Sequence, residues 1–138
     1  MTLNELYRAA KTALESVTED PKFEAACLLE HFCGANRTEL LLHGDKPAES
    51  EAEQAVLSAL EKRKTGEPLQ YLLGEWDFMS LTLSCGEGVL IPREDTAVLV
   101  EAVCKRLSKT ENLPKGLDLC AGTGAVLSLI HISEPTRP

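Results

Sequence analysis

The stretch LDLCAGTG, residues 117–124, decides how this 138-residue sequence is interpreted. Residues 116–120 are a short apolar run that predicts a strand, and the glycines at 122 and 124 predict a tight turn directly after it. In open α/β sheets, a glycine turn at the carboxyl end of a strand lets backbone N–H groups approach a nucleoside closely. The third glycine of a dinucleotide fingerprint is absent. Two interpretations therefore stay open: a plain structural turn, and a ligand-binding turn, which Asp118 favours.

Residues 3–65 predict a run of short helices. Asp20 and Pro21 are typical of an N-cap and a first helical residue, and Gly34 supplies a left-handed stop. Between them, apolar residues recur at helical spacing: Ala25, Leu28, Leu29, Phe32 and Cys33. A capping box that begins at Asn36 predicts a further short helix, which Gly44 closes. Another helix begins near Ser50 and carries the cations 62–64 in its last turn. Its apolar face is Ala52, Ala55, Val56, Ala59 and Leu60.

Residues 71–91 lose the helical period and gain aromatic, β-branched and glycine residues. We expect a hairpin there, with residues 86–88 as its turn and with Trp76 and Phe78 packing it against helices. Asp95 and Thr96 then predict the cap of a helix whose apolar stripe is Val100, Val103, Cys104 and Leu107. The expected fold class is α+β.

The composition excludes several classes of protein. The chain has 14 Lys+Arg against 22 Asp+Glu, a net charge of −8, which disfavours direct nucleic-acid binding. Its five cysteines are odd in number and contain no C-x-x-C pair, so a reducing, cytoplasmic location is expected. No signal peptide and no apolar run of membrane-spanning length occurs in these residues, so we expect no membrane partner.

Four segments, in order and spacing, resemble the release-factor glutamine methyltransferases of the HemK/PrmC type: GEPLQYLLG (66–74), WDF (76–78), VLIPREDT (89–96) and DLCAGTG (118–124). The resemblance implies a helical domain at 1–68 that docks the release factor and a hairpin linker at 69–92. It also implies the start of a Rossmann-like methyltransferase domain at 93–126. The implied activity is methyl transfer from S-adenosyl-L-methionine to the glutamine amide in the GGQ motif of bacterial peptide chain release factors.

The resemblance assigns site residues by position. The cofactor turn falls on Asp118, Cys120, Ala121, Gly122, Thr123 and Gly124, and the active-site border on Pro92, Arg93, Asp95 and Thr96. The family usually has Gly-Thr at 120–121 and Pro at 94. A positive φ at Cys120 would therefore be strained in this chain.

The family's Asn-Pro-Pro-Tyr motif, which grips the glutamine amide, does not occur in these 138 residues, so no catalytic residue is assigned. Residues 127–138 resemble the translated read-through of a sequencing-library adapter, and we expect them to be a non-native tail. The chain as written is therefore expected to be inactive.

Other residues of the chain allow different interpretations. A zinc site at Cys27, His31 and Cys33 is disfavoured because Cys33 falls away from the other two on a helix, so no metal is expected. His43 lies beside Gly44 at the end of the short predicted helix, where a protonated imidazole interacts favourably with the helix dipole. Capping is therefore its expected role. Two alternative functions stay open: a non-catalytic protein-binding helical module, and a nucleic-acid base methyltransferase, which the net charge disfavours.

Overall fold

The computed structural model describes residues 1–109 and 115–133, and the chain divides into two compact units. The first unit is Met1–Leu73 and the second is Gly74–Pro138. The described part mixes helices with one two-stranded antiparallel sheet, so the α+β class is confirmed at that level. None of the helices in the described ranges has the length and apolar character that crossing a membrane requires.

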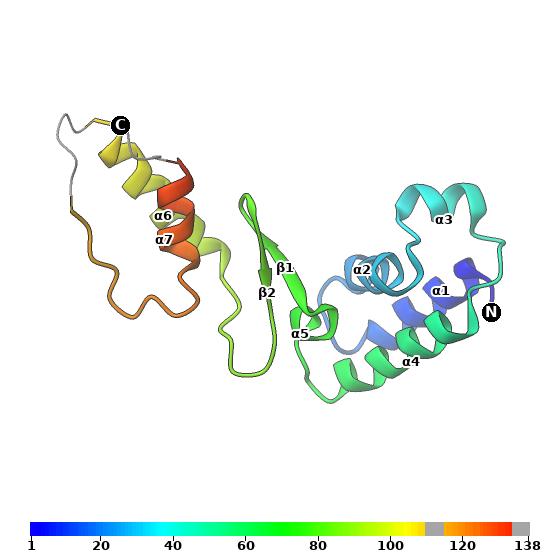
Figure 1. Cartoon of the computed structure of the whole chain (residues 1–138). Helices are drawn as coiled ribbons and strands as arrows, with labels where there is room; N and C mark the ends of the chain where they lie inside the picture. Colours follow the sequence, from blue (N-terminus) through cyan, green and yellow to red (C-terminus); the bar gives the residue numbers. More distant parts are fainter. Residues whose placement is uncertain (110–114, 134–138) are drawn as a thin grey trace. The chain divides into compact units, whose positions relative to one another are not determined.

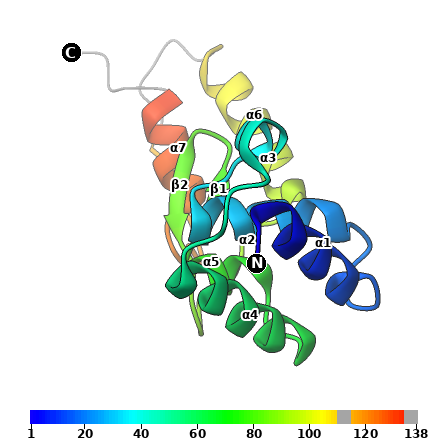
Figure 2. The same ribbon diagram turned by 90° about the vertical axis from the view of Figure 1, so that its right-hand side faces the viewer.

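The first unit is helical (Figure 1). Its helices are α1 (Leu3–Leu14), α2 (Pro21–Cys33), α3 (Arg37–His43), α4 (Ser50–Lys64) and α5 (Leu69–Leu73). Helices α1, α2 and α4 pack on one another, as the view in Figure 2 also shows. Glu24 of α2 is also buried, and the buried apolar residues of these three helices are Leu6, Ala10, Leu14, Ala25, Leu28, Leu29, Val56, Ala59 and Leu60. The predicted stripes of α2 and α4 supply the last six of these residues.

The ends of α2 and α3 follow the local signals in the sequence. The Asp20 side chain accepts a hydrogen bond from the N–H of Phe23 at 3.1 Å, and Gly34 ends α2 with φ 63°. The Asn36 side chain accepts from the N–H groups of Thr38 and Glu39, both at 3.0 Å. These caps satisfy N–H groups that have no partner inside the helix. The predicted starts and stops are confirmed.

Gly44 ends α3 for a different reason from Gly34. Its φ is −61°, which any residue adopts, but it is buried against the first turn of α1. A Cβ placed on Gly44 would collide with the side chain of Asn4 and with the carbonyl oxygen of Leu40. The N–H of Asn4 donates to the Gly44 carbonyl at 2.9 Å, so the two backbones approach closely. Space, and not backbone conformation, requires glycine here.

The second unit begins with a hairpin of β1 (Glu75–Phe78) and β2 (Leu81–Ser84), followed by α6 (Glu94–Leu107) and α7 (Ala125–Ser133). Helices α6 and α7 lie side by side (Figure 1). Its core is small: Phe78, Val100, Ala125 and Leu129, with Leu81, Leu83, Ala97 and Cys104 among the residues packed against it. Leu129 is fully buried although it lies in the segment expected to be a non-native tail.

Three predictions for the second half of the chain are wrong in position. The hairpin turns at residues 79–80, not at 86–88, because the register pairs Trp76 with Leu83 and Phe78 with Leu81. That register places the apolar pairs on one face, where the core holds Phe78. Residues 71–73 belong to α5, not to the hairpin. Helix α6 begins at Glu94 after Arg93, so Asp95 lies in the first turn and is not the cap.

The predicted strand at 116–120 is also wrong, because these residues have irregular backbone. A strand exists only when a neighbour pairs with its N–H and C=O groups. In the described ranges, the sheet contains β1 and β2 alone, and each pairs with the other. An apolar run cannot supply that neighbour by itself.

Gly44→Ala is expected to lower the free energy of unfolding of the helical unit by about 1–3 kcal/mol, because the added Cβ forces α3 away from α1. Chemical denaturation followed by far-UV circular dichroism measures this change. Gly86→Ala is the matched control, since a Cβ there meets nothing within 4 Å and its φ is not positive. Equal unfolding midpoints for the two variants would contradict the steric explanation.

Candidate functional site: a glycine turn and a buried ion pair

The glycine turn precedes α7 and is built from unusual backbone angles. Cys120, Gly122 and Gly124 have φ values of 60°, 58° and 75°. The N–H of Gly124 donates to the carbonyl oxygen of Ala121 at 2.9 Å, which closes the turn. The carbonyl oxygen of Gly124 then accepts from Ser128 at 2.9 Å, which begins α7. Three left-handed residues within five therefore turn the chain from the irregular 115–121 segment into a helix.

The turn leaves its backbone open. A Cβ built on Gly122 or Gly124 would meet nothing within 4 Å, and Ala121 and Thr123 are exposed. The first N–H groups of α7 have no partner inside the helix, and the helix dipole places partial positive charge at this end. The segment 121–125 can therefore offer backbone donors to a polar group of a ligand.

Asp118 is the one acidic residue close to this turn in sequence. Among the described residues, no donor reaches its Oδ2 atom, although that atom is buried. A buried carboxylate oxygen without a hydrogen bond costs free energy until a donor is supplied. A ligand with hydroxyl or N–H groups at this place would supply one.

Cys120 carries the strain that the sequence predicted for it. Its φ of 60° lies in the left-handed region, where a side chain crowds the backbone and glycine is favoured. The thiol itself is exposed. The turn therefore forms with cysteine at a position that suits glycine.

The border residues assigned by resemblance lie at the start of α6. Arg93 is its N-cap residue and makes no side-chain cap, and its carbonyl oxygen accepts from the N–H of Thr96 at 3.0 Å. Pro92 and Thr96 are half-buried, and Arg93 and Asp95 are exposed. The structure thus gathers the six turn residues in one segment before α7. It places the four border residues at the beginning of a different helix, one that packs on α7.

Three other cysteines have suppressed thiolate forms. Desolvation raises the pKa values of the Cys27, Cys33 and Cys85 thiols, and nearby carboxylates raise those of Cys27 and Cys33 further. His31 packs edge-on against Phe32, with the ring centroids 4.7 Å apart. Within residues 1–109 and 115–133, no group of three or more His, Cys, Asp or Glu side chains is placed to hold a metal ion.

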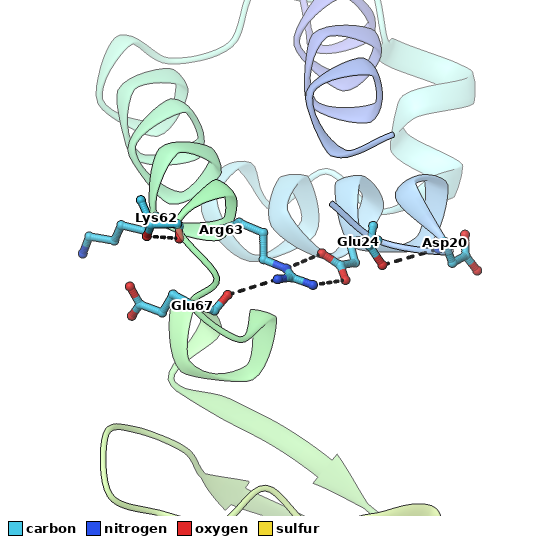
Figure 3. Close-up of polar contacts among 7 residues, drawn as sticks. Asp20, Glu24, Lys62, Arg63 and Glu67 are labelled. Atoms are coloured by element: carbon cyan, nitrogen blue, oxygen red, sulfur yellow. Dashed lines mark hydrogen bonds and ion pairs between the residues drawn. The ribbon is translucent and has the colours of Figure 1, made fainter. Parts of the chain in front are cut away.

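An ion pair in the helical unit was missed by the sequence analysis (Figure 3). Arg63 of α4 donates from Nε and Nη2 to the two carboxylate oxygens of Glu24 on α2, at 2.8 and 3.0 Å. Its Nη1 atom donates to the carbonyl oxygen of Glu67 at 3.4 Å. The Glu24 and Arg63 side chains are only 11% and 17% exposed. This bidentate pair joins α2, α4 and the turn that leads to α5.

A signal for this pair was present in the sequence. Glu24 lies one turn before Leu28, and Arg63 lies one turn after Ala59, so each charge falls on the apolar face of its helix. A buried charge needs a partner of opposite sign, and the two helices were each expected to bury those faces. The hydrogen bonds from Arg63 to Glu24 raise the pKa of the guanidinium. The pair therefore further favours the charged form of a side chain that is charged at neutral and moderately alkaline pH in any case.

Together, these features define a class of protein: a compact helical unit, followed by an α+β unit whose glycine turn opens at the start of a helix. The sequence profile of the family described as PrmC N-terminal domain matches residues 5–74, which covers most of the helical unit. The chain belongs to this family.

Three related proteins share one name. The chain is 40% identical over 121 residues to the release factor glutamine methyltransferase of Haemophilus influenzae, which covers 85% of this chain and 41% of the relative. The proteins of the same name from Coxiella burnetii and Moorella thermoacetica are 33% and 39% identical over 98% and 99% of this chain. The chain spans about half the length of these relatives: 48% and 49% in the last two cases.

Removing one partner of the buried ion pair is expected to destabilise the helical unit. Arg63→Met leaves the Glu24 carboxylate buried without a partner, which costs about 3 kcal/mol of unfolding free energy. Glu24→Gln keeps one of the two acceptors of Arg63 and removes the counter-charge, so its cost is about 1–3 kcal/mol. Urea denaturation at pH 7 measures both variants.

Lys64→Met is the control, because the partner of Lys64 in the described part of the chain is exposed Glu61, and its loss should change stability little. The pKa of Arg63 is higher in the folded chain than in the unfolded chain. The contribution of the pair to the free energy of unfolding is therefore fully present at any pH below the unfolded pKa. The cost of Arg63→Met should therefore not fall between pH 7 and pH 10. A cost equal to that of Lys64→Met would show that the pair contributes nothing.

Cys120→Gly is expected to stabilise the second unit by about 1 kcal/mol, because glycine adopts the left-handed backbone without the Cβ penalty. Cys120→Ala retains the Cβ and removes only the sulfur, so it should match the parent chain. Thermal unfolding monitored by the fluorescence of Trp76 reports on this unit. A gain of similar size in both variants would assign the effect to the thiol and not to the backbone.

Proposed function

We propose that this chain is the N-terminal part of an S-adenosyl-L-methionine-dependent methyltransferase that modifies bacterial peptide chain release factors. The proposed target is the side-chain amide nitrogen of the glutamine in the GGQ motif. The observation that carries the proposal is the match of the helical unit to the PrmC N-terminal domain, with relatives named for this activity at 33–40% identity.

The glycine turn is the proposed cofactor-binding segment, at the start of a Rossmann-like domain. Its open backbone and the unpartnered Oδ2 atom of Asp118 fit a nucleoside that carries hydroxyl and N–H groups. We assign Asp118, Cys120, Ala121, Gly122, Thr123 and Gly124 to this contact. S-adenosyl-L-methionine supplies an activated methyl group on a sulfonium, which leaves as the neutral thioether when the methyl is transferred.

Methyl transfer of this kind depends on positioning. The amide nitrogen gains a carbon bond and loses a proton, and the carbon–sulfur bond of the cofactor breaks, so no side chain of the protein need form a covalent bond. The turn would hold the nucleoside of the cofactor in a fixed place. The reaction between cofactor and glutamine amide then proceeds within one complex and needs no collision of two free molecules. Pro92, Arg93, Asp95 and Thr96, at the start of α6, are the proposed border of that place.

The helical unit is the proposed docking part for the release factor. It forms a compact unit by itself, and the family profile matches residues 5–74, which are almost entirely within this unit. The same observation supports the second candidate function, a protein-binding module without catalysis. Both candidates require contact with the release factor, and only the first requires the cofactor. The five free thiols fit the reducing cytoplasm, where release factors act, and we propose that location.

Fusion of residues 1–126 to the remaining part of the Haemophilus influenzae relative is expected to restore methyl transfer to a purified release factor. Incorporation of labelled methyl groups from S-adenosyl-L-methionine, followed by mass spectrometry of the GGQ peptide, measures the reaction. Gly122→Val in the fusion should reduce incorporation by about 100-fold or more, because the branched side chain fills the open turn and opposes its φ.

A release factor with Ala in place of the GGQ glutamine is the substrate control and should gain no label. Release-factor binding by the fusion without methylation would favour the non-catalytic module. Methylation of DNA, and not of the release factor, would move the protein to the base methyltransferases.

A further inference from the structure

Two glycines with left-handed backbone flank helix α5. Gly66 precedes the helix with φ 99°, and Gly74 follows it with φ 74°. A Cβ built on either glycine would meet nothing within 4 Å, so crowding requires neither of them. Because glycine lacks the steric limits that a Cβ imposes on φ, the chain can change direction at both positions. The boundary between the two compact units also falls here, between Leu73 and Gly74.

The chain is tied together across the first of these glycines. The N–H of Gly66 donates to the carbonyl oxygen of Arg63 at 3.1 Å, and the N–H of Glu67 donates to that of Lys62 at 3.3 Å. The Arg63 side chain spans the same glycine, because its Nη1 atom donates to the carbonyl oxygen of Glu67 at 3.4 Å (Figure 3). Backbone and side chain therefore join the end of α4 to the chain beyond Gly66.

The Arg63 guanidinium is itself held by α2. Its Nε and Nη2 atoms donate to the two carboxylate oxygens of Glu24 at 2.8 and 3.0 Å. A guanidinium is planar and carries its donors in a rigid fork, so fixing two nitrogens also fixes the direction of the third. That third nitrogen is directed at the carbonyl oxygen of Glu67. The ion pair thereby extends from α2, through Arg63, to the residue after Gly66.

Helix α5 continues this connection into the helical unit. It contacts both α2 and α4, and the side chain at its start, Leu69, is only 4% exposed. The N–H groups of Tyr71 and Leu72 donate to the carbonyl oxygen of Pro68 at 3.0 and 3.3 Å. The segment from Glu67 to Leu72 is therefore ordered on the helical unit.

Gly74, in contrast, is joined to the second unit. Its carbonyl oxygen accepts from the N–H of Cys85 at 2.8 Å, one residue beyond the end of β2. Strand β1 begins at the next residue, Glu75. The change from one unit to the other thus takes place within the Leu73–Gly74 step, at a glycine whose φ no Cβ restricts.

We propose that Arg63 locks α5 to the helical unit, so that the two units reorient about the Leu73–Gly74 step and not about Gly66. The lock is a conformational device built from the Glu24 carboxylate, the Arg63 guanidinium and the backbone at Glu67. It makes α5 a rigid extension of the helical unit, and loss of the lock moves the pivot to Gly66. The inference goes beyond the proposed function and does not depend on it.

Backbone nitrogen-15 relaxation of the 138-residue chain locates the pivot. The amides of residues 69–73 should have order parameters of about 0.85, the value of a rigid backbone, and should share the rotational correlation time of α4. The amides of β1 and β2 should show a different correlation time. One correlation time for both units, or an α5 that shares the value of the hairpin, overturns the pivot at Gly74.

The double variant Glu24→Met/Arg63→Met tests the lock. An apolar pair of similar size preserves the contact between α2 and α4, while the link to Glu67 is lost. The order parameters of residues 69–73 should fall below about 0.6, and those of α4 should stay at the parent values. Lys64→Met is the matched control and should leave α5 rigid, since Lys64 pairs with exposed Glu61.

Unchanged order parameters of α5 in the double variant would show that the packing of Leu69 alone holds the helix, which overturns the role of Arg63. An equal fall in Lys64→Met overturns it as well. If the double variant loses the fold of the helical unit, Arg63→Lys decides. An ammonium keeps the charge opposite Glu24 but lacks the fork that also reaches Glu67, so α5 should loosen, and a rigid α5 in Arg63→Lys overturns the lock.

Discussion

The ion pair between Glu24 and Arg63 is the contact on which the helical unit depends. It joins α2 to α4 through two parallel hydrogen bonds, and a third bond from Arg63 reaches the backbone at Glu67, where the chain leaves the bundle (Figure 3). The apolar core of this unit consists of leucine, alanine and valine side chains, whose burial is favourable but not directional. A bidentate pair between buried partners adds geometric specificity to that packing. It joins α4 to α2 and reaches the backbone just before α5.

The second unit has a weaker basis for its fold. Four buried side chains form its core, and large apolar residues remain exposed on α6, α7 and the segment before them: Val98, Leu99, Leu117, Leu119, Leu127 and Ile132. The stripe predicted for α6 places Val100 in the core, because α7 covers it, while Val98 and Leu99 stay outside. The relatives are about twice as long as the region they share with this chain. An exposed apolar surface of this kind fits a unit that more of the same domain covers in a longer protein.

Local signals in the sequence predicted what depends on a few neighbouring residues. The caps at Asp20 and Asn36, the left-handed end at Gly34 and the strain at Cys120 each depend on side chains within about four positions, so they were predicted correctly. The hairpin was predicted with its turn at 86–88, because glycines signal turns. The observed turn at Met79 and Ser80 follows from cross-strand pairing of apolar residues, which local turn preferences do not report. The strand at 116–120 failed for the same reason, since its pairing partner is not local.

The sequence alone therefore determined helices α2, α3 and α4 of the first unit, the position of the glycine turn and the family to which these features point. These features rest on periodicity, capping and backbone preference, which are properties of short segments. Only the tertiary structure decided that Glu24 and Arg63 pair, that Gly44 is required by the approach of α1, and that Leu41 and Leu42 are exposed on α3. Each of these depends on residues that are far apart in the chain or on which side of a helix is covered. Burial and pairing across such distances are set by how the helices pack, and a one-dimensional pattern does not contain that packing.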